Sequence, residues 1–151
     1  MNHPKQALPI ILLLMSSLGA SAHAEQAPFT LDQYRWEHRV LVISAPSSDD
    51  ENLRAQLDEL ASTPGEFEDR DMVLVTLVDN GVSTAGDREL TLADVSAARE
   101  ALRIRSGAFA LRLIGKDGGV KLSRDTATPL QEIYALIDTM PMRRREMSDR
   151  E

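Results

Sequence analysis

The residues best placed to do chemistry are a serine and three acids that follow an apolar run, Ser48-Asp49-Asp50-Glu51. The start of a helix is a common place for anions and nucleophiles, because backbone N–H groups point outward there. Serine needs a neighbouring base before it attacks a substrate. His38 precedes the apolar run and Ser48 follows it, so a strand would hold them at opposite ends. The spacing of Ser48 and Glu51 instead predicts a capping box.

Two other uses of these groups stay open. An enzyme would need Ser48, Asp50 and Glu51 to face one pocket with shifted acidities. The acids, with Asp79, could also gather oxygen ligands around a hard cation. Calcium sites take six or more oxygens from a tightly spaced loop, and these acids are spaced differently. We therefore favour solvated acids at a helix start, with no metal ion and no cofactor.

Two basic segments are candidates for binding a small anion. Lys116 and Lys121 flank a glycine-rich turn whose backbone amides could form a nest. A phosphate-binding loop precedes a helix, whereas a strand is expected here, so turn formation is the favoured interpretation. The second candidate is a run of three arginines, Arg143, Arg144 and Arg145. We expect them on a charged tail over 142–151, solvated or docked on an acidic partner.

The composition removes whole classes of chemistry. The chain has no cysteine, so thiol redox catalysis, thiolate metal sites and cysteine nucleophiles are excluded. Its 24 acidic and 17 basic residues give a formal net charge of −7. Such a surface repels phosphate backbones, so we expect no nucleic-acid partner.

The first 24 residues have the three-part layout of a secretory signal. Lys5 lies in a short polar start, an apolar run covers 7–15, and small residues end at Ala24. The run is shorter than the roughly 20 apolar residues that cross a bilayer as a helix. We expect cleavage after Ala24, a periplasmic or secreted product without a membrane span, and a partner among other envelope or extracellular proteins.

The rest of the chain alternates strand and helix signals. Apolar runs at 40–43 and 72–78 lack alternation and predict central strands covered on both faces. A hairpin is expected from 109 to 122, because Asp-Gly lies between two apolar runs. Helices are expected over 49–61 and from Pro129 to about Met140. A third helix is expected to begin with a cap formed by Thr91 and Asp94. Its apolar stripe consists of Leu92, Val95, Ala98 and Leu102. The segment 81–89 predicts a loop.

This order predicts one α/β domain over residues 25–141. Two parallel strands joined by a helix, followed by a second helix and a hairpin, give a mixed sheet of four to five strands with helices on both faces. That is the thioredoxin-like arrangement.

The chain resembles thioredoxins in the strand before Pro46 and in the hairpin Ile114-Gly115-Lys116-Asp117-Gly118-Gly119-Val120. On this resemblance Ser48 takes the place of the nucleophilic cysteine and Glu51 that of its partner. Val42 takes the place of a buried proton-transfer acid, and Phe109-Ala110 replaces the cis-proline region. The resemblance therefore implies the scaffold without its redox centre.

A closer resemblance covers nearly all of the segment after residue 24. Its motifs are Tyr34-x-Trp36-x-x-Arg39, Asp69-Arg70-Asp71, the hairpin above, and Ile137-Asp138-x-Met140-Pro141-Met142-Arg143-Arg144. They are similar to an uncharacterised family of exported bacterial domains of the DUF4174 type, related to domains in animal sushi-repeat and coiled-coil extracellular-matrix proteins. The resemblance implies a thioredoxin-like or peroxiredoxin-like fold and no settled activity. Our preferred hypothesis is a non-catalytic binding or adaptor domain.

Overall fold

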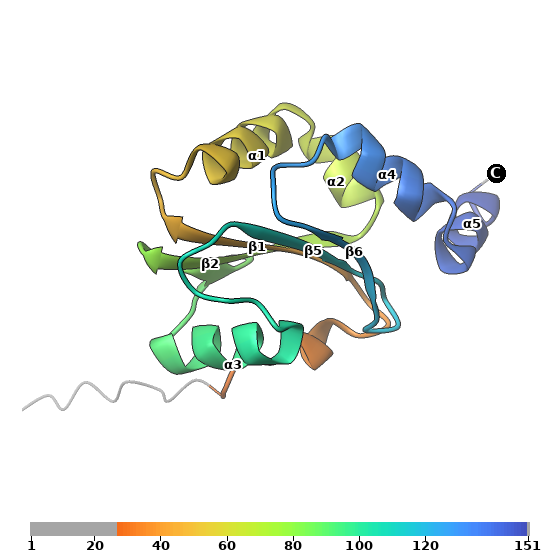
Figure 1. The fold of residues 1–151 in the computed structure, drawn as a ribbon. Coiled ribbons are helices and arrows are strands. Elements are labelled where there is room, and N and C mark those ends of the chain that lie inside the picture. Colours follow the sequence, from red (N-terminus) through yellow and green to blue (C-terminus); the bar gives the residue numbers. More distant parts are fainter. Residues whose placement is uncertain (1–26, 151) are drawn as a thin grey trace, which may run out of the picture.

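The computed structural model describes residues 27–150, so the expected signal segment lies outside the described residues. A single sheet is covered by helices on both faces (Figure 1). The elements follow in the order 3-10 helix Leu31–Tyr34, β1 Arg39–Ser47, α1 Glu51–Ser62, α2 Pro64–Asp69, β2 Met72–Asn80, β3 Thr84–Ala85, β4 Arg88–Glu89, α3 Leu92–Leu102, β5 Ala110–Ile114, β6 Val120–Arg124, α4 Leu130–Asp138 and α5 Pro141–Ser148.

The sheet has the strand order β4-β3-β2-β1-β5-β6. β1 runs parallel to β2, with Arg39 opposite Met72 and Ser47 opposite Asn80, and antiparallel to β5. Helices α1, α2 and α4 lie over one face and α3 over the other, while α5 lies beyond the end of α4 (Figure 1). The predicted α/β class, mixed sheet and helices on both faces are confirmed.

The central strand β1 explains why its sequence does not alternate between apolar and polar residues. Leu41 and Ile43 point into the core beneath α1 and α4, and Val40 and Val42 point into the core beneath α3. All four side chains are almost completely buried. A strand covered on both faces needs apolar residues at every position.

The sheet has six strands, one more than the upper number predicted. β3 and β4 fall in the segment expected to be a loop, and they pair around Gly86 at φ +57°. Strands of two residues carry no periodicity that a sequence pattern can detect.

The helix starts agree only partly with the predicted caps. Thr91 and Asp94 cap α3 as predicted, and they do so in a capping box. For α1 the predicted Ser48 box is wrong, because the cap is Asp50, whose carboxylate accepts the amide of Leu53 at 3.0 Å. α4 begins after Pro129, and its first amide, Leu130 N, donates to Glu59 Oε1 of α1 at 2.9 Å.

The expected charged tail is wrong for most of its length. Residues Pro141–Ser148 form α5, in which Pro141 occupies the first turn, a position that tolerates its missing N–H. Arg143, expected to be solvated, is only 3% exposed. The reason is a set of acids elsewhere in the chain that face this helix.

Candidate functional site

The carboxyl ends of β1 and β2 meet at one edge of the sheet, where Ser48 and Asn80 lie close together. Ser48 Oγ is exposed and donates to the Asn80 carbonyl oxygen at 3.4 Å. A Cβ at Gly81 would lie 3.2 Å from Ser48 Oγ and 2.9 Å from Val78, so this position fits a glycine closely. The predicted serine is therefore placed at the expected edge, with a backbone carbonyl as its partner.

The acids beside Ser48 do not form a reaction centre with it. Asp50 caps α1, and Asp49 and Glu51 are exposed. Among residues 27–150, no hydrogen bond joins Ser48, Asp50 or Glu51 to one another. Each is an isolated polar group on the surface or a structural cap.

His38 cannot serve Ser48 as a base. His38 directly precedes β1 and Ser48 directly follows it. Ten residue steps along an extended strand span about 30 Å. A serine without a base within hydrogen-bond reach is a weak nucleophile.

A polar network that the sequence did not reveal lies at the same edge. Arg99 of α3 donates to Ser44 Oγ at 3.1 Å, to the Leu77 carbonyl at 2.9 Å and to Asp79. Asp79 also accepts from Ser106 Oγ and from the Gly107 amide, both at 2.7 Å. Burial alone would raise the pKa of Asp79, but these donors outweigh it and hold that pKa below its ordinary value.

This network ties the end of β2 to α3 and to the loop before β5. The carboxylate of Asp79, which the sequence offered as an oxygen ligand for a cation, binds the guanidinium of Arg99 instead. Arg99 stands among the polar positions of a predicted helix, so its sequence context carried no sign that it reaches the sheet.

A groove of mixed character lies over this network. Its cavity measures about 350 Å³, and its lining combines apolar Val78, Val95 and Ile104 with Asp79, Arg99 and Ser106 of the network. Leu92, which the sequence placed in the apolar stripe of α3, also lines the groove but is 88% exposed. Val82 is 62% exposed. The bond from Leu90 N to the Ser83 carbonyl, 2.8 Å, brings the segments that carry Leu92 and Val82 side by side.

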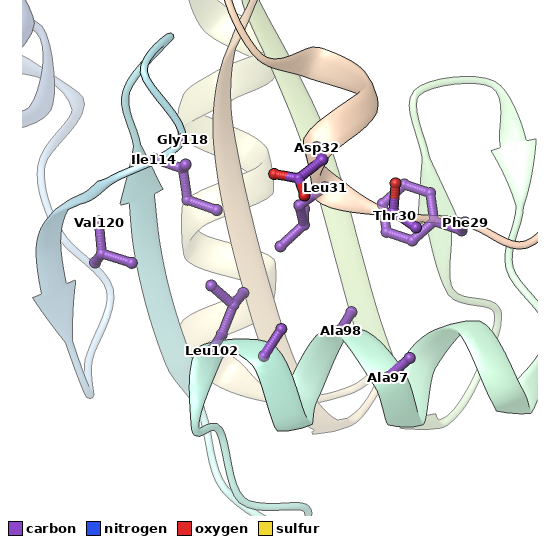
Figure 2. A pocket seen from close by; sticks show the side chains of 11 residues that line it. Phe29, Thr30, Leu31, Asp32, Ala97, Ala98, Leu102, Ile114, Gly118 and Val120 are labelled. Carbon is purple, nitrogen blue, oxygen red and sulfur yellow. The ribbon is translucent and has the colours of Figure 1, made fainter.

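A second hollow, of about 300 Å³, lies between α3, the 3-10 helix and the β5–β6 hairpin (Figure 2). Its lining is mostly apolar, and Leu31, Leu102 and Val120 point toward it. The carboxylate of Asp32 at its rim is paired with Arg35 at 3.2 Å. The hollow therefore offers packing surface and few groups for chemistry.

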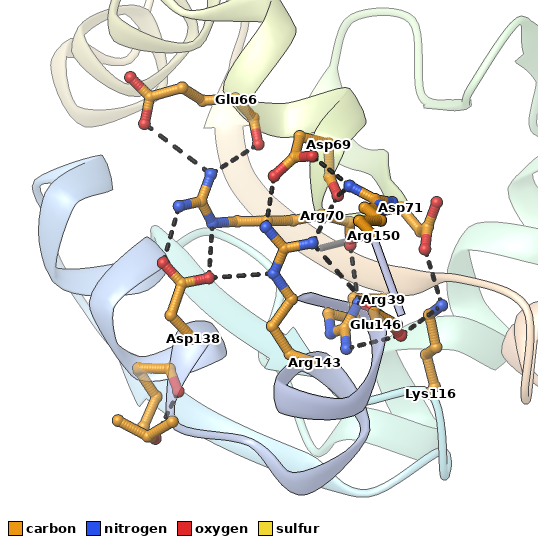
Figure 3. Close-up of polar contacts among 12 residues, drawn as sticks. Arg39, Glu66, Asp69, Arg70, Asp71, Lys116, Asp138, Arg143, Glu146 and Arg150 are labelled. Atoms are coloured by element: carbon orange, nitrogen blue, oxygen red, sulfur yellow. Dashed lines mark hydrogen bonds and ion pairs between the residues drawn. The ribbon is translucent and has the colours of Figure 1, made fainter. Parts of the chain in front are cut away.

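The predicted basic candidates lie at the opposite end of β1 (Figure 3). Lys116 Nζ lies 2.8 Å from Asp71 Oδ2 and 2.8 Å from Glu146 Oε1. Lys121 Nζ lies 2.6 Å from Asp117 Oδ2. The turn between them has the predicted hairpin form, with Gly118 at φ +83°. Both lysines are paired with acids rather than presented as a bare anion nest.

The three arginines of α5 have different roles. Arg143 contacts Asp69 and donates to Asp138 at 3.1 Å, whereas Arg144 and Arg145 are exposed. The hydrogen bond from Arg143 holds the pKa of Asp69 below its ordinary value. The predicted binding run is thus divided between one structural residue and two surface residues.

Arg143 belongs to a larger set of ion pairs at this end of the sheet (Figure 3). Arg70 binds Asp138 at 2.7 Å and Arg39 binds Glu146 at 3.1 Å. The cluster holds five basic and five acidic side chains, Arg39, Arg70, Lys116, Arg143, Arg150, Glu66, Asp69, Asp71, Asp138 and Glu146. Because its charges balance, it is suited to fasten α5 to the sheet. We call it the α5 cluster.

Neither a cluster of metal-ligating side chains nor a membrane-spanning helix is found in residues 27–150. No three His, Asp or Glu side chains gather there as metal ligands would. Within the same range, no helix has the length and apolar character needed for a bilayer crossing.

Comparison with known families supplies the identity of this scaffold. The family model described as "Domain of unknown function (DUF4174)" matches residues 30–146, which include every helix and strand from the 3-10 helix into α5. The chain belongs to the DUF4174 family. The resemblance inferred from the sequence motifs is thereby confirmed, and the family description gives no activity.

Two similar proteins are parts of larger molecules. The sushi repeat-containing protein SRPX2 of Xenopus laevis is 31% identical over 121 residues, which cover 78% of this chain and 26% of that protein. The coiled-coil domain-containing protein 80 of Danio rerio is 29% identical over 150 residues, which cover 86% of this chain and 17% of that protein. The chain therefore spans about a quarter and about a sixth of these relatives.

Solved structures place the family within the thioredoxin-like fold. A reduced 2-Cys peroxiredoxin of Plasmodium vivax superimposes with a TM-score of 0.56 at 15% identity, covering 76% of this chain and 84% of that one. Thioredoxin peroxidase I of Plasmodium yoelii superimposes with a TM-score of 0.55 at 16% identity, covering 78% of this chain and 80% of that one. At such identities the likeness shows the fold alone, and this chain has no cysteine with which to act as a thiol peroxidase.

Proposed function

We propose that the chain is an exported, non-catalytic adaptor that binds another protein through the carboxyl-end edge of β1 and β2. One observation carries the proposal. At the edge where Ser48 is exposed, the only hydrogen-bond partner of its hydroxyl among the described residues is a backbone carbonyl, and both oxygens of Asp79 accept from structural donors. A reaction centre would need a nucleophile with a base or a free acid pair.

The same edge has the features of a protein contact. Leu92 and Val82 expose large apolar side chains next to the groove, and exposed apolar patches mark interaction sites. The exposed acids Asp49 and Glu51 lie on the turn after β1 and at the start of α1. The occupant that fits is a partner segment with an apolar side chain flanked by lysine or arginine.

Export is part of this proposal and rests on the layout of residues 1–24. A partner would then be met in the periplasm or outside the cell. Pulse-labelling that follows conversion to a product starting at Glu25, with fractionation, tests this part separately.

The binding proposal is tested by photocrosslinking in the native envelope. A photoreactive residue at Val82 should capture a partner, and the same residue at Gln131, exposed on α4, should not. Leu92→Glu should abolish the crosslink while the melting temperature stays within about 2 °C, because Leu92 is 88% exposed. Replacing Asp49 and Glu51 with lysine should weaken it several-fold.

Two results would overturn the adaptor proposal. One is a crosslink at Val82 that persists unchanged in both variants. The other is turnover of an ester, peptide or phosphoester by the purified chain that is lost in Ser48→Ala.

A further inference from the structure

A cavity of about 320 Å³ lies between the β5–β6 hairpin and the junction of α4 with α5. This volume falls within the roughly 300–1,000 Å³ range of small-molecule sites. One wall is apolar and consists of Leu136, Met140, Pro141 and Met142. The other wall carries charge and consists of Arg39, Lys116, Asp117 and Lys121.

Arg39 contributes a donor that the folded chain leaves unused. Its side chain is 1% exposed, and its two terminal nitrogens bind Glu146. The buried Nε has no hydrogen-bond partner among the described residues. A buried N–H without an acceptor destabilises a protein. Arg39 lines the cavity, so a small shift of its covered guanidinium would let an acceptor in the cavity reach Nε and remove that cost.

The two lysines also have donors to spare. An ammonium group carries three N–H donors. Lys116 uses two of them on Asp71 and Glu146, and Lys121 uses one on Asp117. The Lys121 side chain is 33% exposed and is therefore able to turn toward a ligand.

The N-terminus of α5 opens on the same cavity. Met140 is its N-cap residue and Pro141 and Met142 begin the helix, and all three line the cavity. No side chain among residues 27–150 caps this end. The uncapped first turn carries partial positive charge and free N–H groups.

We propose that this cavity binds a small amphiphilic monocarboxylate. The carboxylate accepts from Arg39, Lys121 and the start of α5, and the alkyl chain packs against Leu136, Met140 and Met142. Glu146, Asp71 and Asp117 already balance the charges of Arg39, Lys116 and Lys121, so recognition depends on the spare N–H donors, and a ligand with one negative charge is repelled less by these acids than one with two. This inference goes beyond the adaptor proposal and concerns the opposite end of β1.

The test uses the chain labelled with ¹³C at the methionine methyl groups and titrated with octanoate. The methyl signals of Met140 and Met142 should shift saturably, whereas that of Met72, buried in the core, should not. Hexanoate should bind about fifteenfold more weakly, since each lost methylene costs about fourfold.

Matched variants separate the charge from the apolar wall. Lys121→Gln should weaken octanoate binding about fivefold or more, because a charge-assisted hydrogen bond is lost. Arg124→Gln on the same strand removes an equal charge from a pair with Glu132 and should leave binding unchanged. Met142→Glu should abolish binding, while Leu92→Glu should not affect it.

Three outcomes would overturn the proposal. Equal binding of 1-octanol would show an apolar cavity without carboxylate recognition. Equal shifts with inorganic phosphate would show an unspecific anion site. No shift of Met140 or Met142 with octanoate would show that the cavity takes no such ligand.

Discussion

Arg39 and Glu146 form a two-pronged ion pair across 107 positions of sequence, with both N–O distances at 3.1 Å. Arg39 opens the central strand and is 1% exposed, while the Glu146 side chain is 20% exposed. A buried guanidinium needs such a partner, because an unpaired buried charge strongly destabilises the fold. This pair makes the last helix part of the domain.

Removing the carboxylate of this pair should destabilise the whole domain. Glu146→Gln should lower the free energy of unfolding by about 2 kcal/mol, below the 3–5 kcal/mol of a fully buried pair because Glu146 is partly exposed. Urea titration measures the change, and hydrogen exchange should show faster opening of α5. Glu66→Gln is the control, because the Glu66 side chain is 48% exposed and lies 3.8 Å from Arg70, so this pair should contribute less than about 1 kcal/mol. Equal losses in the two variants would contradict a special role of Glu146.

The α5 cluster should make stability depend on acid. Burial alone would raise the pKa of Glu146 and of Asp138, but hydrogen bonds from their basic partners outweigh it and lower both values. A lowered folded-state pKa gives stability that is present above the unfolded-state value and is lost as the pH falls through the folded-state value. Unfolding free energy should therefore be flat above about pH 5 and fall from about pH 4 downward. A loss that begins near pH 6 would point to another group.

Two substitutions test which residue caps the N-terminus of α1. Asp50→Ala should cost about 1 kcal/mol, because the Leu53 amide loses its acceptor. Ser48→Ala should stay within about 0.5 kcal/mol, because its exposed hydroxyl only reaches a carbonyl at 3.4 Å. Thermal unfolding measures both. The reverse order would restore the capping box expected from the sequence.

The network around Asp79 should hold the loop before β5 in place. Asp79→Ala leaves Arg99, Ser106 and the Gly107 amide without their shared acceptor and should cost about 2 kcal/mol. Hydrogen exchange at Gly107 should accelerate well beyond the change caused by the loss of global stability. Asp87→Ala, an exposed acid, serves as the control and should leave Gly107 unchanged. Protection of Gly107 that survives Asp79→Ala would show another source of order.

Local patterns were sufficient for the framework of the fold. The apolar runs became β1 and β2, Thr91 and Asp94 formed their capping box, and the turn at Gly118 formed the hairpin. Each of these signals depends on residues within a few positions of one another. Such signals are the ones that strand and helix periodicity and turn chemistry describe.

The sites depended on contacts that no local pattern contains. Arg143 was expected in a solvated tail because its neighbours are charged, yet its acceptors Asp69 and Asp138 come from α2 and α4. Arg99 likewise finds Asp79 and Ser44 only after α3 packs on the sheet. Leu92 matched the apolar stripe by spacing, but it is the first residue of α3 and its side chain is 88% exposed.

The distance in sequence between Arg39 and Glu146 also sets the order in which the domain can mature. A growing chain that has not yet reached residue 146 lacks the carboxylate that compensates the guanidinium of its central strand. The sheet therefore reaches its final stability only after the segment that carries Glu146 has been synthesised.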